Sequence, residues 1–306
     1  MPDFDLSSKH RPEYISRVNR VVDYVREHVD EPLPIARLAH LAALSPFHFH
    51  RVFKSVSGEP LAAFVLRTRL EKAARALVAN RRRSALYIAL QHGFSSAATF
   101  ARAFRAHFGM APTDWRRGGH LRYSKNRKLQ SKACKANVPL LRDAHGVLKV
   151  TITDIPAQRI AYMRRIAPYE QEGILSFWLR VWKWVIARGL ATPELVSLGV
   201  IHDDVDVTHA GNCQYDAAVV VADDFEPDAG VNMGYSPGGR YAAYAYDGPI
   251  MQMGAVWREV FDEWFAMSGF RQDDRPCLVV FCGSPMPDGA AAGRLRGQLC
   301  VPVRLA

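Results

Sequence analysis

The chain has 306 residues, of which 49% are hydrophobic and 23% are charged, which is ordinary for a globular protein and long enough for two domains. It holds no apolar run of about 18 residues, so we expect no membrane span, and its polar first residues predict no secretory signal. The five cysteines are scattered and odd in number, which favours free thiols in a reducing cytoplasm.

The net charge of +10 is divided unevenly along the chain. Residues 1–147 hold 26 Lys and Arg against 11 Asp and Glu, a balance of +15. Residues 148–306 hold 14 against 19, a balance of −5. We therefore expect only the first half to meet a polyanion such as nucleic acid.

The first half is predicted to be a series of helices with clear stop signals, after a ragged tail over residues 1–12. Ser45 is typical of an N-cap, Pro46 of a first helical position and Gly58 of a helix end. Pro112 is expected to stop the unit, with Trp115 packed on its last turn. The predicted helices span residues 13–29, 35–41, 46–56, 60–80, 85–91 and 96–108.

Two of these helix pairs have nearly the same sequence pattern. Leu44-Ser45 matches Phe94-Ser95 at an offset of 50, and the Arg51 to Phe53 stretch matches Arg102 to Phe104 at an offset of 51. A repeated helix–turn–helix in a basic region predicts a protein that places two helices in DNA. The helix between the pairs would be roughly 28 Å long at 1.5 Å per residue, of the order of one duplex turn.

The repeat resembles the AraC/XylS family of transcription regulators over residues 15–117. The resemblance rests on the I-A-x-x-x-G-F-S stretch from Ile88 to Ser95 and on F-x-R-x-F-R-x-x-F-G-x-x-P from Phe100 to Pro112. It implies that the base-contacting positions are those of the two second helices. On the first helix these are Phe47, His50 and Arg51, and on the second Ala97, Ala98, Ala101 and Arg102.

The chemistry of these two faces is unequal. Arg51 can bond guanine bidentately and Phe47 can contact a thymine methyl, whereas alanines offer only apolar contact. We therefore hypothesise that the first helix recognises most of the sequence and that the second mainly binds phosphates through Ser96, Arg102 and Arg105. Lys54 is also expected on the exposed face of the first helix, although Lys54 and Arg105 could equally be solvated surface charges.

Residues 118–147 are basic and hold few large apolar side chains, which predicts a solvated linker. The linker could be a mere spacer, or it could add contacts to the DNA backbone. The expected domains are therefore a helical DNA-binding domain over 13–117, the linker over 118–147 and a further domain over 148–306.

From Leu148 the periodicity changes to that of strands. Arg159 and Pro168 match Arg240 and Pro249 at an offset of 81, and a tryptophan-bearing helix follows each copy. Two strand–helix–strand–strand copies predict a pseudo-twofold α+β domain with a cleft between them. The predicted strands span residues 148–154, 159–165, 196–201, 217–221, 278–281 and 299–303, and the first helix spans 172–187.

This half resembles the GyrI-like effector-binding domains, on motifs such as Ala167-Pro168-Tyr169-Glu170 and Pro237-Gly238-Gly239-Arg240-Tyr241. The resemblance implies a cleft for hydrophobic, often cationic, compounds. The stretch 276–281 departs from the family because it lacks the usual acidic residue, so the ligand could be neutral, or Glu170, Asp247, Glu259 or Glu263 could serve instead. The candidate ligand-binding residues are Tyr169, Glu170, Phe177, Trp178, Trp182, Tyr244, Trp257, Phe261 and Trp264.

We therefore expect a transcription regulator that binds promoter DNA, RNA polymerase and a hydrophobic effector in the bacterial cytoplasm at the nucleoid. It needs no cofactor or metal, and one chain could bind its site as a monomer. One alternative is a GyrI-like hydrolase that uses Glu170 with Tyr169 or Tyr244 for acid–base chemistry. Another is a ligand-independent regulator whose C-terminal half contacts other proteins. No pattern identifies a catalytic residue.

Overall fold

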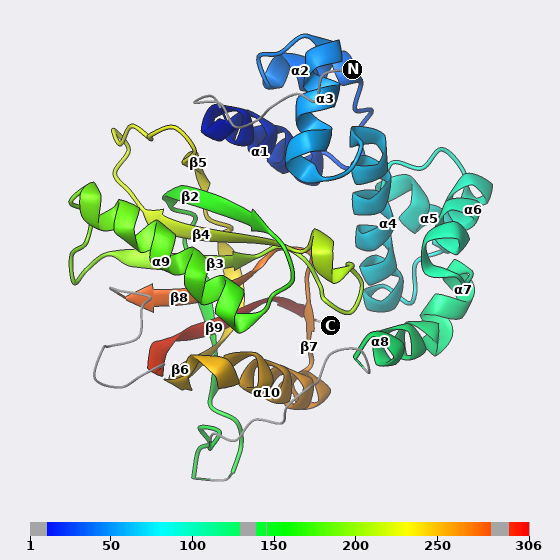
Figure 1. Ribbon diagram of the computed structural model, residues 1–306. Coiled ribbons are helices and arrows are strands. Elements are labelled where there is room, and N and C mark those ends of the chain that lie inside the picture. The colour runs from blue at the N-terminus through cyan, green and yellow to red at the C-terminus, as the bar shows by residue number, and fades with distance from the viewer. Residues whose placement is uncertain (1–10, 129–138, 145, 283–293, 306) are drawn as a thin grey trace. The chain divides into compact units, whose positions relative to one another are not determined.

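The computed structural model describes residues 11–128, 139–144, 146–282 and 294–305 (Figure 1). The chain divides into two compact units. The first contains the residues up to Arg127 together with Glu226–Asn232, and the second contains the rest.

The first unit is helical, and each of the six predicted helices begins and ends within two residues of its predicted bounds. Ser45 accepts a hydrogen bond from the backbone of His48 as the N-cap of α3, and Gly58 ends that helix with φ of 80°. Helix α1 begins two residues earlier than expected, so Arg11 and Pro12 are helical. The helices are α1 (Arg11–Glu27), α2 (Ile35–Leu41), α3 (Pro46–Ser57), α4 (Leu61–Ala79), α5 (Ala85–Gln91), α6 (Ala97–Phe108), α7 (Pro112–Asp114), the π-helical turn η1 (Trp115–Gly119) and α8 (His120–Lys128).

Each helix pair buries one apolar face. In the first pair Phe49 and Phe53 pack with valines of α1 and with Phe64 of α4. In the second pair the rings of Phe104 and Phe108 pack on Trp115, whose indole N–H donates to the carbonyl of Ala74 on α4 at 3.0 Å. Helix α4 therefore contributes to both cores.

The stretch predicted as a linker contains a helix, α8, and Pro112 does not stop the helical unit. Helix α8 continues the first unit, because the ring of Tyr123 packs on Phe108 and Trp115. At the other end, Leu141 donates its backbone N–H to the hydroxyl of Tyr244 at 2.7 Å. The sequence concealed both contacts because each depends on one aromatic residue, Tyr123 within the basic stretch and Tyr244, which lies 103 residues after Leu141. Residues 129–138 lie outside the described part.

The second unit is one antiparallel sheet with two long helices (Figure 1). Helices α9 (Gln171–Ala187) and α10 (Met253–Ser268) each follow a strand of the sheet, β2 and β6. The strands are β1 (Val150–Ile155), β2 (Arg159–Ile166), β3 (Val196–Ile201), β4 (Gln214–Val220), β5 (Asn232–Tyr235), β6 (Gly239–Pro249), β7 (Phe270–Gln272), β8 (Cys277–Cys282) and β9 (Arg294–Leu305), and the short 3₁₀ turns are η2 (Ala210–Asn212) and η3 (Ile250–Gln252).

The strand order confirms the predicted pseudo-twofold repeat. The order is β1-β6-β9-β8-β3-β4-β2-β5, with β7 paired to β9. Strands β1, β2, β3 and β4 of the first copy correspond to β5, β6, β8 and β9 of the second. Replacing each strand by its counterpart gives the same order read from the other end, and the two copies meet where β3 pairs with β8. Strands β5 and β7 were not predicted, and β4 and β9 begin earlier than expected.

Candidate functional site

Helix α3 presents an exposed face of large polar and aromatic side chains. Phe47 is 77% exposed at the first turn, and His50, Arg51 and Lys54 are exposed with it. The opposite face buries Phe49 in the core. In a helix–turn–helix unit the exposed N-terminal part of the second helix contacts base edges, so these four side chains lie on the predicted face.

Helix α6 presents the equivalent face with different chemistry. Ala97, Ala98 and Ala101 are exposed, as are Arg102 and Arg105. The buried face of this helix consists of phenylalanines, so its core resembles that of α3. The two helices are therefore alike in packing and unlike in what they offer to a partner.

Ser96 lies at the same end of α6, but its hydroxyl is already hydrogen-bonded within the helix. Its hydroxyl accepts the backbone N–H of Thr99 at 3.2 Å and lies 3.0 Å from the hydroxyl of Thr99. Ser45 caps α3 in the same way. The first role of Ser96 is thus an N-cap, which sequence reasoning had assigned only to Ser45.

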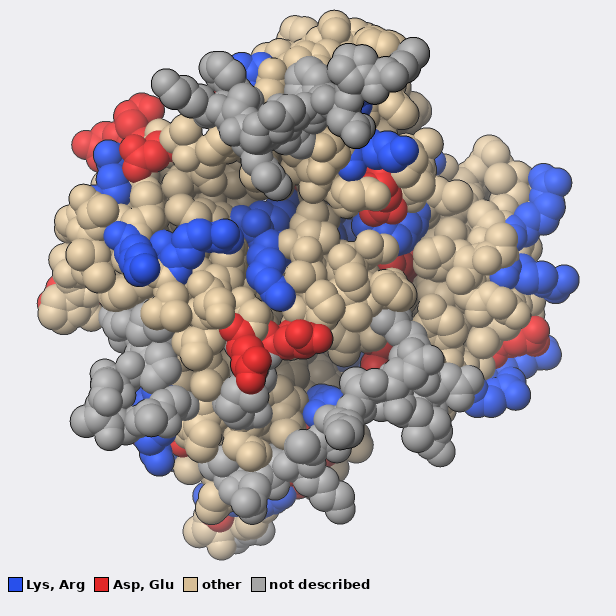
Figure 2. All heavy atoms as spheres, in the orientation of Figure 1, with Lys and Arg blue, Asp and Glu red and all other residues tan. Residues whose placement is uncertain are grey.

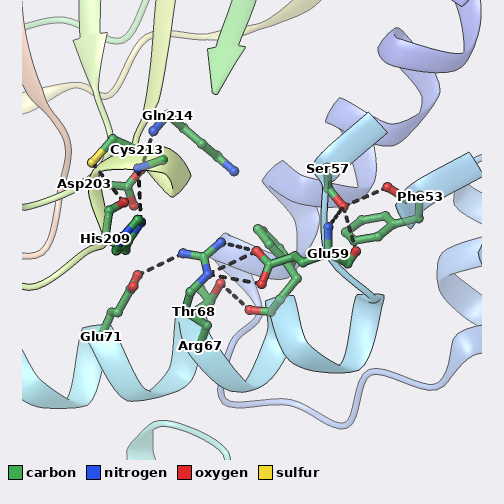
Figure 3. A network of polar contacts seen from close by, with 12 residues as sticks. Phe53, Ser57, Glu59, Arg67, Thr68, Glu71, Asp203, His209, Cys213 and Gln214 are labelled. Carbon is green, nitrogen blue, oxygen red and sulfur yellow. Dashed lines mark hydrogen bonds and ion pairs between the residues drawn. The ribbon is translucent and has the colours of Figure 1, made fainter. Parts of the chain in front are cut away.

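Ion pairs and hydrogen bonds hold α4 in place between the helix pairs. The guanidinium of Arg67, whose side chain is 7% exposed, lies 2.6 Å from Glu59 and 3.1 Å from Glu71 (Figure 3). Two residues further along, Arg69 donates to the carbonyls of Val29 and Glu31. Glu59 directly follows the end of α3, so the buried pair fixes that helix relative to α4.

The turn of the second pair also depends on α4. A Cβ atom at Gly93, which has φ of 75°, would lie 2.6 Å from the guanidinium carbon of Arg69. Only glycine fits there without strain. Arg69 thereby connects the loop after α1 with the turn between α5 and α6, and this contact helps to set the separation of the two exposed faces.

Basic side chains are abundant on the surface of the helical unit. Arg81, Arg82 and Arg83 are exposed between α4 and α5, and the guanidinium of Arg83 lies 4.8 Å from the ring centre of Tyr87. Figure 2 shows Lys and Arg side chains protruding at the edge that carries α5, α6 and α7. Such a surface suits a polyanion.

The candidate ligand-binding residues of the second unit fall into two groups. Around α9, Phe177 and Trp178 are buried, Tyr169 and Trp182 are half-buried, and Glu170 is exposed at the start of the helix. The indole N–H of Trp178 donates to the hydroxyl of Tyr215 at 2.8 Å. Sequence reasoning missed Tyr215. The signal for it was Gly199 on the neighbouring strand β3, where a Cβ atom would overlap the Tyr215 hydroxyl.

The second group surrounds α10. Phe261 and Tyr244 are buried, and Trp257 lies 5.5 Å from Phe261 between ring centres. Trp264 stacks instead on Phe270, with 5.7 Å between the ring centres. The exposed ion pair between Glu263 and Arg142 holds the residues before β1 against this helix.

A buried ion cluster distinguishes the two copies of the repeat. Arg164 on β2 bonds both carboxylate oxygens of Asp216 at 2.6 Å, and His202 lies 2.6 Å from the same carboxylate. Burial alone would raise the pKa of Asp216, but the charges of Arg164 and then His202 hold it well below its ordinary value. At the corresponding register of the second copy, Ala245 faces Gln298, so the cluster occurs once.

Within the described ranges no helix is long and apolar enough to cross a membrane. The same residues contain no group of three or more His, Cys, Asp or Glu side chains that could hold a metal ion.

Two family models match the chain. A helix–turn–helix domain model matches residues 38–118, and the model described as the GyrI-like small molecule binding domain matches residues 148–304, about half of the chain. Similar solved structures include the DNA-binding domain of AdpA in complex with a target DNA, with 27% identity over 35% of this chain and 96% of that one at a TM-score of 0.33. The C-terminal domain of EcmrR covers 52% of this chain and 98% of its own, with 13% identity and a TM-score of 0.41.

The curated relatives named here match between 29% and 38% of the chain. The SPbeta prophage-derived regulator YosT of Bacillus subtilis is 30% identical over 38% of this chain and 77% of its own length. The transcription factor PqrA of Proteus vulgaris is 39% identical over 29% of this chain and 73% of its own length. The right origin-binding protein of Escherichia coli is 39% identical over 31% of this chain, but the match spans only 32% of that protein. The chain therefore belongs to the AraC-type helix–turn–helix transcription regulators and carries a C-terminal domain of the GyrI-like small molecule binding family.

Proposed function

We propose that this DNA-binding transcription regulator recognises an asymmetric promoter site, with α3 contacting base edges and α6 mainly anchoring the chain on phosphates. The observation that carries the proposal is the contrast between the two exposed faces. Phe47, His50 and Arg51 on α3 can discriminate bases, whereas the exposed alanines of α6, at positions 97, 98 and 101, cannot form side-chain hydrogen bonds to them.

Each face has a distinct physical role in this proposal. Arg51 has the planar fork that matches guanine, and Phe47 is exposed enough to contact a thymine methyl. On α6 the small alanines allow close approach of the helix backbone to the groove, and Arg102 and Arg105 supply charge. Lys54 adds a further cation next to the first face. Because one chain carries both helices, it can bind its site as a monomer.

Selection of bound sequences from a random DNA library tests this division. We expect most of the selected information in the half-site of α3. Arg51→Ala is expected to weaken binding to the selected site by about 1–3 kcal/mol and to remove the base preference at one position of that site. Lys54→Ala should weaken binding to all sequences equally and should lower the slope of log affinity against log salt concentration by about one. Equal information in the two half-sites would refute the division.

We infer further that an apolar small molecule bound in the C-terminal domain modulates the regulator. The GyrI-like match and the aromatic residues around α9 and α10 support this inference. Modulation requires that the compound bind two states of the protein with different affinities. RNA polymerase is the expected partner at the promoter, and the expected location is the bacterial cytoplasm, where promoter DNA lies. We propose no catalytic step.

In vitro transcription from a selected site, with and without a library of hydrophobic compounds, tests the modulation. A compound that changes transcript yield and quenches tryptophan fluorescence would support it. Transcription that no compound alters, at concentrations that saturate any observed binding, would favour a ligand-independent regulator.

A further inference from the structure

The hydroxyl of Tyr215 lies in the layer between the sheet and α9. Ala218 on the same strand belongs to the core cluster of one sheet face, so Tyr215, an odd number of residues away, points to the other face. There its ring lies 6.4 Å from that of Phe177 and 6.3 Å from that of Tyr169, and the residue is 3% exposed. Gly199 on the adjacent strand leaves the room that the hydroxyl occupies.

The hydrogen bonds of this hydroxyl are incomplete. A phenol offers one donor hydrogen and accepts in addition. The indole of Trp178 donates to the Tyr215 oxygen, but among the described residues no acceptor is found for the phenol proton. A buried donor without an acceptor is costly, so an acceptor supplied by a ligand would be bound favourably at this position.

The surroundings of Tyr215 do not favour a cation. Asp216 is the carboxylate whose charge reaches the phenol, and it is already bonded by Arg164 and His202 on the other face of the sheet. Burial, the largest effect, raises the pKa of Tyr215 well above its ordinary value, so the phenol stays a protonated donor. Burying an organic cation here would leave its charge unpaired.

The second copy of the repeat does not offer the same donor. At the register that corresponds to Tyr215, strand β9 carries Gly297, and the ring of Phe281 fills the space over that glycine. Phe281 also packs on Trp178, with 5.9 Å between ring centres. Among the described residues, the phenol donor at Tyr215 therefore has no equivalent at the corresponding position of the second copy.

We propose that the effector site is centred on the Tyr215 hydroxyl and takes a neutral, apolar compound with a strong hydrogen-bond acceptor, such as a phosphoryl or carbonyl oxygen, rather than an organic cation. The ligand acceptor bonds the phenol proton, and the ligand rings contact Trp178 and Phe281. The inference rests on the proposed function, because it assumes that the C-terminal domain binds a small molecule.

Two probes of similar size separate the possibilities. Triphenylphosphine oxide is neutral and a strong acceptor, whereas tetraphenylphosphonium is a cation without an acceptor. Titration of the full-length protein, followed by tryptophan fluorescence and by calorimetry, is expected to give at least 10-fold tighter binding of the oxide. Tighter binding of the cation, or binding of neither probe, would overturn the proposal.

Variants then locate the contact. Tyr215→Phe is expected to weaken binding of the oxide about 10-fold and to leave the affinity for the cation unchanged. Tyr235→Phe, at a tyrosine that is 72% exposed, should alter neither affinity. Trp178→Phe keeps the phenol and should retain the preference for the oxide, which covers the case that Tyr215→Phe folds poorly. Equal loss of both probes in folded Tyr215→Phe would refute a specific hydrogen bond.

The outcome is distinguishable from failure of the proposed function. If a compound alters transcription but its affinity is the same for Tyr215→Phe, the regulator is ligand-responsive and this site is wrong. If the oxide binds through Tyr215 and transcription does not respond, the site is correct and the proposed modulation is wrong.

Discussion

Replacing Asp216 by asparagine removes the charge at the centre of the buried ion cluster. The side chains of Arg164 and Asp216 are only 2% and 4% exposed. Removing one member of such a buried pair costs about 3–5 kcal/mol, because the remaining charge loses its compensation in a medium that solvates it poorly. We expect Asp216→Asn to destabilise the second unit by this amount at neutral pH.

Chemical denaturation followed by tryptophan fluorescence measures the effect, because five of the six tryptophans lie after residue 147. Asp154→Asn is the matched control: its carboxylate is 73% exposed and 3.7 Å from Arg240, so we expect a cost of at most about 1 kcal/mol. Arg164→Met combined with Asp216→Leu should recover most of the loss. A cost for Asp216→Asn no greater than that of the control would refute the reasoning.

The same variant has a defined pH signature. The pKa of Asp216 is lowered in the folded chain relative to about 3.9 in the unfolded chain. A lowered carboxyl pKa contributes stability that is fully present above the unfolded value and is lost as the pH falls through the folded value. The stability gap between wild type and Asp216→Asn should therefore shrink as the pH falls below the unfolded value and towards the folded one. A gap that widened in acid would contradict the assignment.

Two further substitutions test the packing around the candidate sites. Gly199→Ala places a methyl group where the Tyr215 hydroxyl lies, so we expect the free energy of unfolding to fall by about 1–3 kcal/mol and the melting temperature to fall with it. An unchanged melting temperature would show that the phenol moves aside without cost. Trp115→Phe removes the hydrogen bond to the Ala74 carbonyl and is expected to lower the free energy of unfolding of the helical unit by about 1–3 kcal/mol. Thermal unfolding followed by the helical circular dichroism signal measures this loss, and a loss below about 0.5 kcal/mol would contradict the expected role of the bond.

The helix boundaries were predictable because their signals are local. Ser45, Pro46 and Gly58 determine where α3 begins and ends through their own side chains and backbone preferences. Strand β4 was placed too late for the opposite reason. Its first residues, Gln214 and Asp216, are polar yet buried, and their partners lie on other segments, so no local pattern marks them as strand.

The candidate sites show the same difference. Helical periodicity alone separates Phe47 and Arg51 from the buried Phe49, so the exposed face of α3 follows from the sequence. The side chains between α9 and the sheet do not follow from it, because Trp178 is buried and Trp182, one turn later, is half-buried in an equally apolar helix. Tyr215 gains its meaning only from strand register, since Gly199 lies on a different strand.

Both units are built from repeats, and in both the copies have kept their packing while their polar groups have diverged. The cores under α3 and α6 are alike, and Arg51 has Arg102 as its counterpart, but Phe47 and His50 on α3 correspond to Ala98 and Ala101 on α6. In the sheet, the position of the second copy that corresponds to Tyr215 is Gly297. Packing constrains both copies of a repeat equally, whereas a ligand or an asymmetric DNA site needs each group only once. Differences between the copies are therefore where specificity is expected, and they lie at Phe47 and His50 in the helical unit and at Tyr215 in the sheet.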